Sequence, residues 1–177
     1  MAKGAPIYKL TQPDLPLRDS AFVILVRLQE MYDWATAIRD PLRVEELHNM
    51  RIAAKRLRYT MEIFAPCFGS EFSDALNRVE KIQERIGAIH DCDVLVPLLT
   101  QTLEKEARRE RKRALDEGGG PPAQMAAEGL APLIASKHAE RSRLYHEFIA
   151  FWDALPPEGL FQKITRAVHG ESVATGK

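Results

Sequence analysis

The sequence predicts an all-α protein, an antiparallel bundle of about five to six helices. Apolar residues recur at helical spacing through most of the chain, and clusters of proline and glycine separate the periodic stretches. No stretch shows the strict apolar and polar alternation of a half-buried strand. A length of 177 residues suits one domain with a buried core.

Capping residues and helix breakers divide the chain into six predicted helices. Asp19 and Ser20 cap the first, Gly87 ends the third, and Asp91 caps the fourth. The predicted helices are 19–39, 44–64, 73–86, 91 to beyond 113, 124–154 and 160–168. Residues 1–18 are expected to form a loose arm, residues 171–177 a disordered tail, and residues 19–170 the helical domain. Gly118 to Pro122 is expected to be a flexible turn.

Composition disfavours membrane and secreted proteins. No apolar stretch reaches the roughly 20 residues that cross a bilayer, and Cys67 and Cys92 are too few for a disulfide framework. We therefore expect a cytoplasmic protein with reduced thiols. The formal net charge is zero, so a polyanionic partner can be inferred only from where the cations lie.

The predicted helix 44–64 separates apolar from basic residues. Its apolar side carries Leu47, Met50, Ala54, Leu57, Met61 and Phe64. Its basic row, on an adjacent side, consists of His48, Arg51, Lys55 and Arg58. Arginine can hold phosphate oxygens through two parallel hydrogen bonds, so such a row suits a chain-like anion. A solvated basic face with nearby glutamates explains the same pattern equally simply.

Two strings resemble a known family. The first is His48-Asn-Met-Arg-Ile-Ala-Ala-Lys-Arg-Leu-Arg-Tyr-Thr-Met-Glu-Ile-Phe64, and the second is Lys81-Ile-Gln-Glu-Arg-Ile-Gly-Ala-Ile-His-Asp-Cys-Asp-Val94. The first string is similar to the signature helix of the CHAD (conserved histidine α-helical domain) family. The second is similar to the part that follows in the same family, a helix end, a glycine turn and an aspartate that begins the next helix. The resemblance covers about residues 42–99.

The resemblance implies non-catalytic binding of inorganic polyphosphate in a basic, histidine-containing groove, and an association with polyphosphate granules. The matching string adds Arg56 to the candidate residues. Members usually contain two facing helical halves, whereas the signature occurs here once. The chain is then a single-repeat member, a part of a longer arrangement, or one partner of a homodimer that rebuilds the channel.

Further cations are candidate ligands by position. Arg78, Lys81 and Arg85 align on the predicted third helix and are expected to form a facing wall of the groove. Lys137 and Arg141 interrupt the apolar face of the predicted helix 124–154, so they must snorkel, pair with an acid, or line an anion site. Arg27 interrupts the apolar face of the first helix in the same manner.

Other functions have weaker support. His90, Asp91, Cys92 and Asp93 lack metal-ligand spacing, so no metal and no other cofactor is expected. The chain shows no nucleophile with a base and no phosphate loop, which indicates no enzyme. Nucleic acid is disfavoured because Tyr59 is the one aromatic residue beside the basic row. A nucleic-acid-binding domain and an adaptor for an acidic partner protein remain the alternatives.

Overall fold

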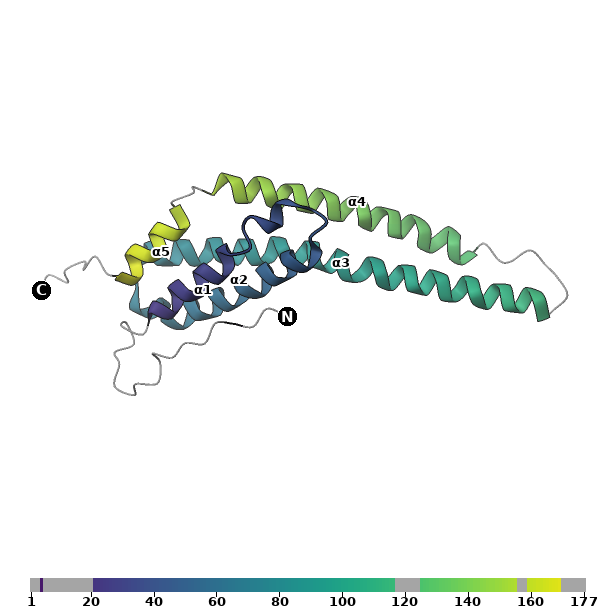
Figure 1. Cartoon of the computed structure of the whole chain (residues 1–177), viewed down its shortest axis with the longest axis horizontal. Helices are drawn as coiled ribbons and strands as arrows, with labels where there is room; N and C mark the ends of the chain where they lie inside the picture. The colour runs from purple at the N-terminus through teal and green to yellow at the C-terminus, as the bar shows by residue number, and fades with distance from the viewer. Residues whose placement is uncertain (1–3, 5–20, 117–124, 156–158, 170–177) are drawn as a thin grey trace, which may run out of the picture. The chain divides into compact units, whose positions relative to one another are not determined.

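The structure, a computed structural model, describes residues 4, 21–116, 125–155 and 159–169. These residues form five α-helices and no strand, which confirms the all-α fold class (Figure 1). The helices are α1 (Phe22–Tyr32), α2 (Val44–Phe64), α3 (Ser70–Asp116), α4 (Met125–Ala154) and α5 (Gly159–His169). Two short 3-10 turns, η3 (Ala37–Arg39) and η4 (Ala65–Cys67), flank α2. The expected arm, glycine turn and tail lie outside the described residues, apart from Gly4.

The chain divides into two compact units. The first consists of Met1–Gly87 and Glu147–Lys177, and the second of Ala88–His146. Helices α3 and α4 each contribute one part to each unit.

The first unit has a closed apolar core. Helix α1 packs against α2 and α5, and Figure 1 shows these helices together. Leu28 of α1, Leu57 of α2 and Ile164 of α5 are fully buried. In α2, the predicted apolar side is the buried side: Leu47, Met50, Ala54, Leu57, Met61 and Phe64. Helical periodicity therefore identified the core face of this helix correctly.

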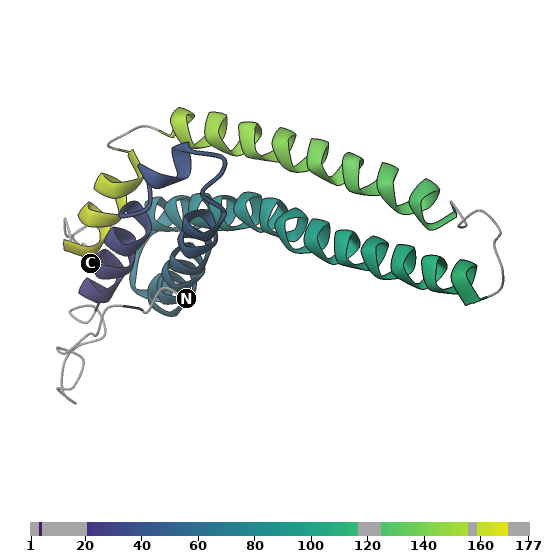
Figure 2. The ribbon, with the colours of Figure 1, turned by 45° about the vertical axis from the view of Figure 1, so that its right-hand side comes forward.

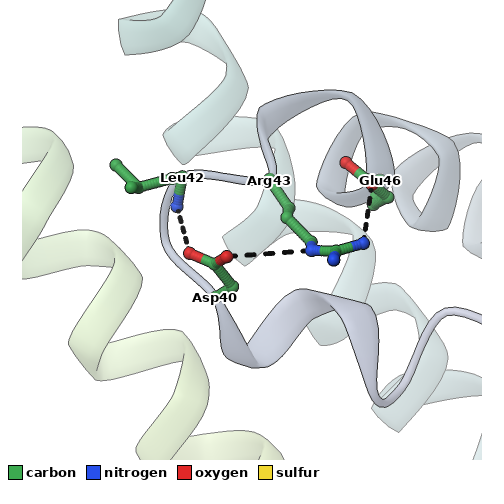
Figure 3. Close-up of polar contacts among 4 residues, drawn as sticks. All are labelled: Asp40, Leu42, Arg43 and Glu46. Carbon is green, nitrogen blue, oxygen red and sulfur yellow. Dashed lines mark hydrogen bonds and ion pairs between the residues drawn. The ribbon is translucent and has the colours of Figure 1, made fainter.

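Helix α2 begins at Val44, as predicted. The Asp40 carboxylate accepts a hydrogen bond of 2.9 Å from the Leu42 backbone N–H and lies 3.7 Å from Arg43 Nε (Figure 3). Arg43 in turn lies 3.1 Å from the Glu46 carboxylate in the first turn of the helix. Since these contacts are exposed, they contribute little stability, but they orient the chain as it enters the helix.

Helix α1 is shorter than predicted. It ends at Tyr32 rather than near residue 39, and the segment after it continues as turns and η3. The backbone N–H groups of Trp34 and Ala35 bond to carbonyls three residues earlier, at Met31 and Tyr32. This tightened geometry ends an α-helix, while Ile38 still reaches the core.

The predicted break at Gly87 is wrong, and so is the predicted cap at Asp91. Both residues lie inside α3, which is continuous over 47 residues. Glycine inside a helix costs only about 1 kcal/mol relative to alanine. Burial of Ile82, Ile86 and Ile89 at successive helical positions outweighs that cost.

The second unit is a helical hairpin. The C-terminal part of α3 runs antiparallel to the N-terminal part of α4, and Figures 1 and 2 show the two side by side. Arg141 Nε of α4 donates a 2.8 Å hydrogen bond to the Asp93 carboxylate of α3. Where the structure describes burial between residues 93 and 144, no residue is buried. Two helices alone leave their apolar side chains half-exposed.

Candidate anion-binding face of α2

The outward face of α2 carries an exposed lysine beside an exposed aromatic ring. Lys55 is exposed, and Tyr59, one turn later, retains 45% of its surface. Lys55 Nζ lies 5.7 Å from the centre of the Tyr59 ring, and the Arg58 guanidinium carbon lies 4.7 Å from it. The ring therefore holds two cations of the predicted row close together.

On the α3 edge of this face, Arg51 rests against a glycine. A Cβ built at Gly87 would lie 3.7 Å from Arg51 Nε, in ordinary van der Waals contact. Arg51 is half-buried, and its Nε is buried without a hydrogen bond to any described group. None of the ion pairs within the described residues includes Arg51. Its guanidinium therefore keeps hydrogen-bonding capacity that no carboxylate of the described residues uses.

Arg58 has a different environment on the same edge. One of its terminal nitrogens lies 3.4 Å from the Glu62 carboxylate and 3.4 Å from the Glu80 carboxylate of α3. Only 19% of the Arg58 side chain is exposed. Because its charge is already shared between two acids, Arg58 links α2 to α3 and is a weaker candidate ligand than Arg51.

On the α1 edge, Arg56 and Arg27 meet at Gly4. Each of their guanidinium carbons lies 3.5 Å from the position of a Cβ built on Gly4. Two predicted site residues from different helices are therefore close neighbours. Arg27 also lies 2.7 Å from the carboxylate of Glu30, which partly neutralises the pair.

His48 lies on the outward side of α2 by helical spacing, one turn before Arg51 and two turns before Lys55. It is half-buried. Its ring can donate a hydrogen bond to an anion. The predicted row thus follows one helix from His48 to Arg58.

The cations of α3 lie on another edge of their helix. Helix α3 meets Arg51 and Arg58 at Gly87 and Glu80. At about 100° per residue, Arg78, Lys81 and Arg85 lie roughly 100° or more away from that edge. Arg85 stacks on the Phe151 ring, 4.5 Å from its centre. These contacts give no support to the prediction that the three residues face the α2 row across one groove.

Lys137 and Arg141 belong to the second unit, and both pair with acids. Lys137 Nζ lies 2.6 Å from the Glu140 carboxylate, and Arg141 Nε lies 2.8 Å from the Asp93 carboxylate. The Arg141 and Asp93 side chains retain only 16% and 12% of their exposure. Of the three alternatives for these cations, the structure shows pairing with an acid.

Two ionisable groups around Lys137 are shifted. The hydrogen bond from Lys137 lowers the pKa of the Glu140 carboxyl below its usual value, and the same bond raises the pKa of Lys137. Burial raises the pKa of the Cys92 thiol, and the charge of Glu140 adds to that rise.

The described residues contain no group of three side chains that would hold a metal ion, and none of their helices has the length and apolarity of a membrane span.

Fold and face together define an all-α protein in which one helix presents a row of cations, with Arg27 of α1 beside it. The family model of the CHAD domain matches residues 12–100, half of the chain, and the chain belongs to this family. The matched region contains α1, α2 and α3 as far as residue 100. Comparisons with curated proteins and with solved structures gave no match.

Sequence reasoning missed three residues that contact predicted site residues. Gly87 provides the surface on which Arg51 lies, whereas Glu80 and Asp93 neutralise Arg58 and Arg141. The signal for Gly87 was present, because a glycine inside an apolar helical period often marks a close approach. Glu80 and Asp93 gave no such signal, since each pairs with a residue distant in the sequence.

Proposed function

We propose that this protein binds inorganic polyphosphate on the outward face of α2, without catalysing a reaction. Membership of the CHAD domain family supports the ligand class. The observation that supports a binding site on α2 is the environment of Arg51 and Lys55. Both cations lie on one helix face, and neither forms an ion pair with a described residue.

A linear polyanion fits this face better than a single phosphate does. His48 and Lys55 are seven residues apart, which spans roughly 10 Å along the helix axis at about 1.5 Å per residue. Arg51 lies between them on one edge, and Arg56 with Arg27 lies on the other. A polyphosphate chain therefore meets several cations in succession, whereas pyrophosphate reaches one or two.

Nucleic acid is the alternative ligand that the test must separate. Single-strand binders stack successive bases on several exposed aromatic rings. On the outward face of α2, Tyr59 is exposed, and the Arg58 guanidinium already lies over its ring. A backbone that carries charge without bases suits this face better. We further propose a cytoplasmic location at polyphosphate granules.

A competition titration tests the proposal. Labelled long-chain polyphosphate is bound to the protein at several salt concentrations and displaced by pyrophosphate, RNA, single-stranded DNA or unlabelled polyphosphate. We expect long chains to compete far better than pyrophosphate or nucleic acid of equal phosphate content, and affinity to fall steeply with salt. Equal competition by RNA contradicts polyphosphate specificity, and equal competition by pyrophosphate contradicts the row of contacts.

A further inference from the structure

The exposed side of α3 in the second unit combines apolar and charged residues in a fixed order. Val94 and Leu98 are exposed apolar residues, at 55% and 57% of their full surface. Asp91 lies seven residues before Leu98, and Lys105 lies seven residues after it. Because seven residues are close to two helical turns, all four residues share one side of the helix.

Among the described residues of the hairpin, the charges at the two ends of this row have no ionic partner. Asp91 and Lys105 are both exposed, and neither forms an ion pair with a residue that the structure describes. The row therefore runs from an acid, through two apolar residues, to a base. When two such rows run in opposite directions, each acid faces a base and the apolar residues face one another.

We propose that a second copy of this chain covers the row, with the two α3 helices packed antiparallel around Leu98. In that arrangement each Asp91 faces the partner's Lys105, and the two Leu98 side chains meet at the twofold axis. A parallel pair would instead set Asp91 against Asp91 and Lys105 against Lys105, which like-charge repulsion opposes. Val94 lies beside Leu98 in each copy and adds apolar contact area.

The side of α3 that carries Val94 and Leu98 stays more than half exposed at both residues in the hairpin. A second α3 packed on this side would cover both of them. The dimer is independent of the proposed ligand, since Asp91, Val94, Leu98 and Lys105 are not in the α2 row.

Sedimentation equilibrium without polyphosphate tests the dimer by exchange of charges. We expect the wild-type chain to dimerise reversibly, and Asp91→Lys and Lys105→Glu each to raise the dissociation constant by about tenfold or more. The double variant restores opposite charges within every facing pair. Mixing the two single variants does the same in a heterodimer, so both preparations are expected to recover the wild-type dissociation constant.

Two further variants complete the design. Leu98→Asp is expected to give a monomer with unchanged helix content, because Leu98 is exposed. Arg111→Glu, a charge reversal on another side of α3, is expected to dimerise like the wild type. A wild-type chain that stays monomeric at the highest concentration overturns the proposal. So does a mixture of Asp91→Lys and Lys105→Glu that associates no better than either variant alone.

Discussion

Arg51 of α2 lies against Gly87 of α3, with its Nε 3.7 Å from the position that a Cβ would occupy there. This contact brings an arginine of α2 next to the backbone of α3. A Cβ at this position would be in ordinary van der Waals contact with Arg51, so there is room for a methyl group. We expect a longer side chain at position 87 to compete with Arg51 for the same space.

Substitution of Gly87 separates helix stability from ligand binding. Gly87→Ala should stabilise the protein by about 0.5–1 kcal/mol, since alanine favours the helix and its methyl group fits. Gly87→Leu should displace Arg51 and weaken polyphosphate binding. Gly129 is the matched control, because a Cβ there meets no atom within 4 Å. Melting curves and polyphosphate titrations measure both effects. Equal polyphosphate affinity of Gly87→Leu and Gly129→Leu would show that the contact between Arg51 and Gly87 does not matter for binding.

Arg58 is expected to contribute to stability as well as charge. Arg58→Ala removes the link from α2 to Glu80 and should cost about 0.5–1 kcal/mol, the range for a partly exposed ion pair. Arg51→Ala loses no such pair and should melt near the wild-type temperature. Both variants should bind polyphosphate more weakly. If Arg51→Ala loses more stability than Arg58→Ala, the assignment of roles to the two arginines is wrong.

Arg141 should behave as a structural residue. Arg141→Met leaves the Asp93 carboxylate, only 12% exposed, without its partner, and should destabilise the protein by roughly 1–3 kcal/mol. The double variant Asp93→Leu/Arg141→Met removes both charges and should recover most of that loss. Thermal unfolding measures these differences. Polyphosphate affinity should fall less in Arg141→Met than in Arg51→Ala. A larger loss in Arg141→Met would show that Arg141 belongs to the ligand site.

The pair of Lys137 and Glu140 gives a pH dependence of known sign. Since the pKa of Glu140 is lowered in the folded protein, the pair stabilises the fold above the usual carboxyl value of 4.5, and this contribution is lost as pH falls through the lowered pKa. Melting temperatures of wild type and Lys137→Met are compared from neutral pH down to about pH 3. We expect the difference between them to shrink on acidification; a constant difference would exclude the pair as its cause.

Local patterns predicted the helices well where one apolar face decides them. The bounds of α2 and its core side follow from the spacing of Met50, Leu57 and Met61. The break at Gly87 was mispredicted because a weak local preference for ending a helix yields to burial on both sides of it. Burial in the folded protein, which the sequence alone does not show, decides that the helix continues through Gly87.

The sequence indicated which cations are candidates for the site, but not which of them form ion pairs. Helical spacing placed Arg51, Lys55 and Arg58 on one row, yet it gave no reason to separate the paired Arg58 from the unpaired Arg51. Long-range partners such as Asp93 for Arg141 are 48 residues apart in the sequence. Only the packing of the helices reveals which cations are already neutralised.

The affinity of long-chain polyphosphate for two charge-matched double variants tests the central claim most directly. Arg51→Ala/Lys55→Ala removes two cations from the α2 face, and Arg111→Ala/Lys112→Ala removes two exposed cations from the second unit. The first variant should lose about tenfold or more in affinity, with a salt slope smaller by roughly one for each lost phosphate contact, whereas the second should bind nearly as the wild type does. Equal losses in both variants would contradict a binding face on α2 and indicate a general effect of net charge.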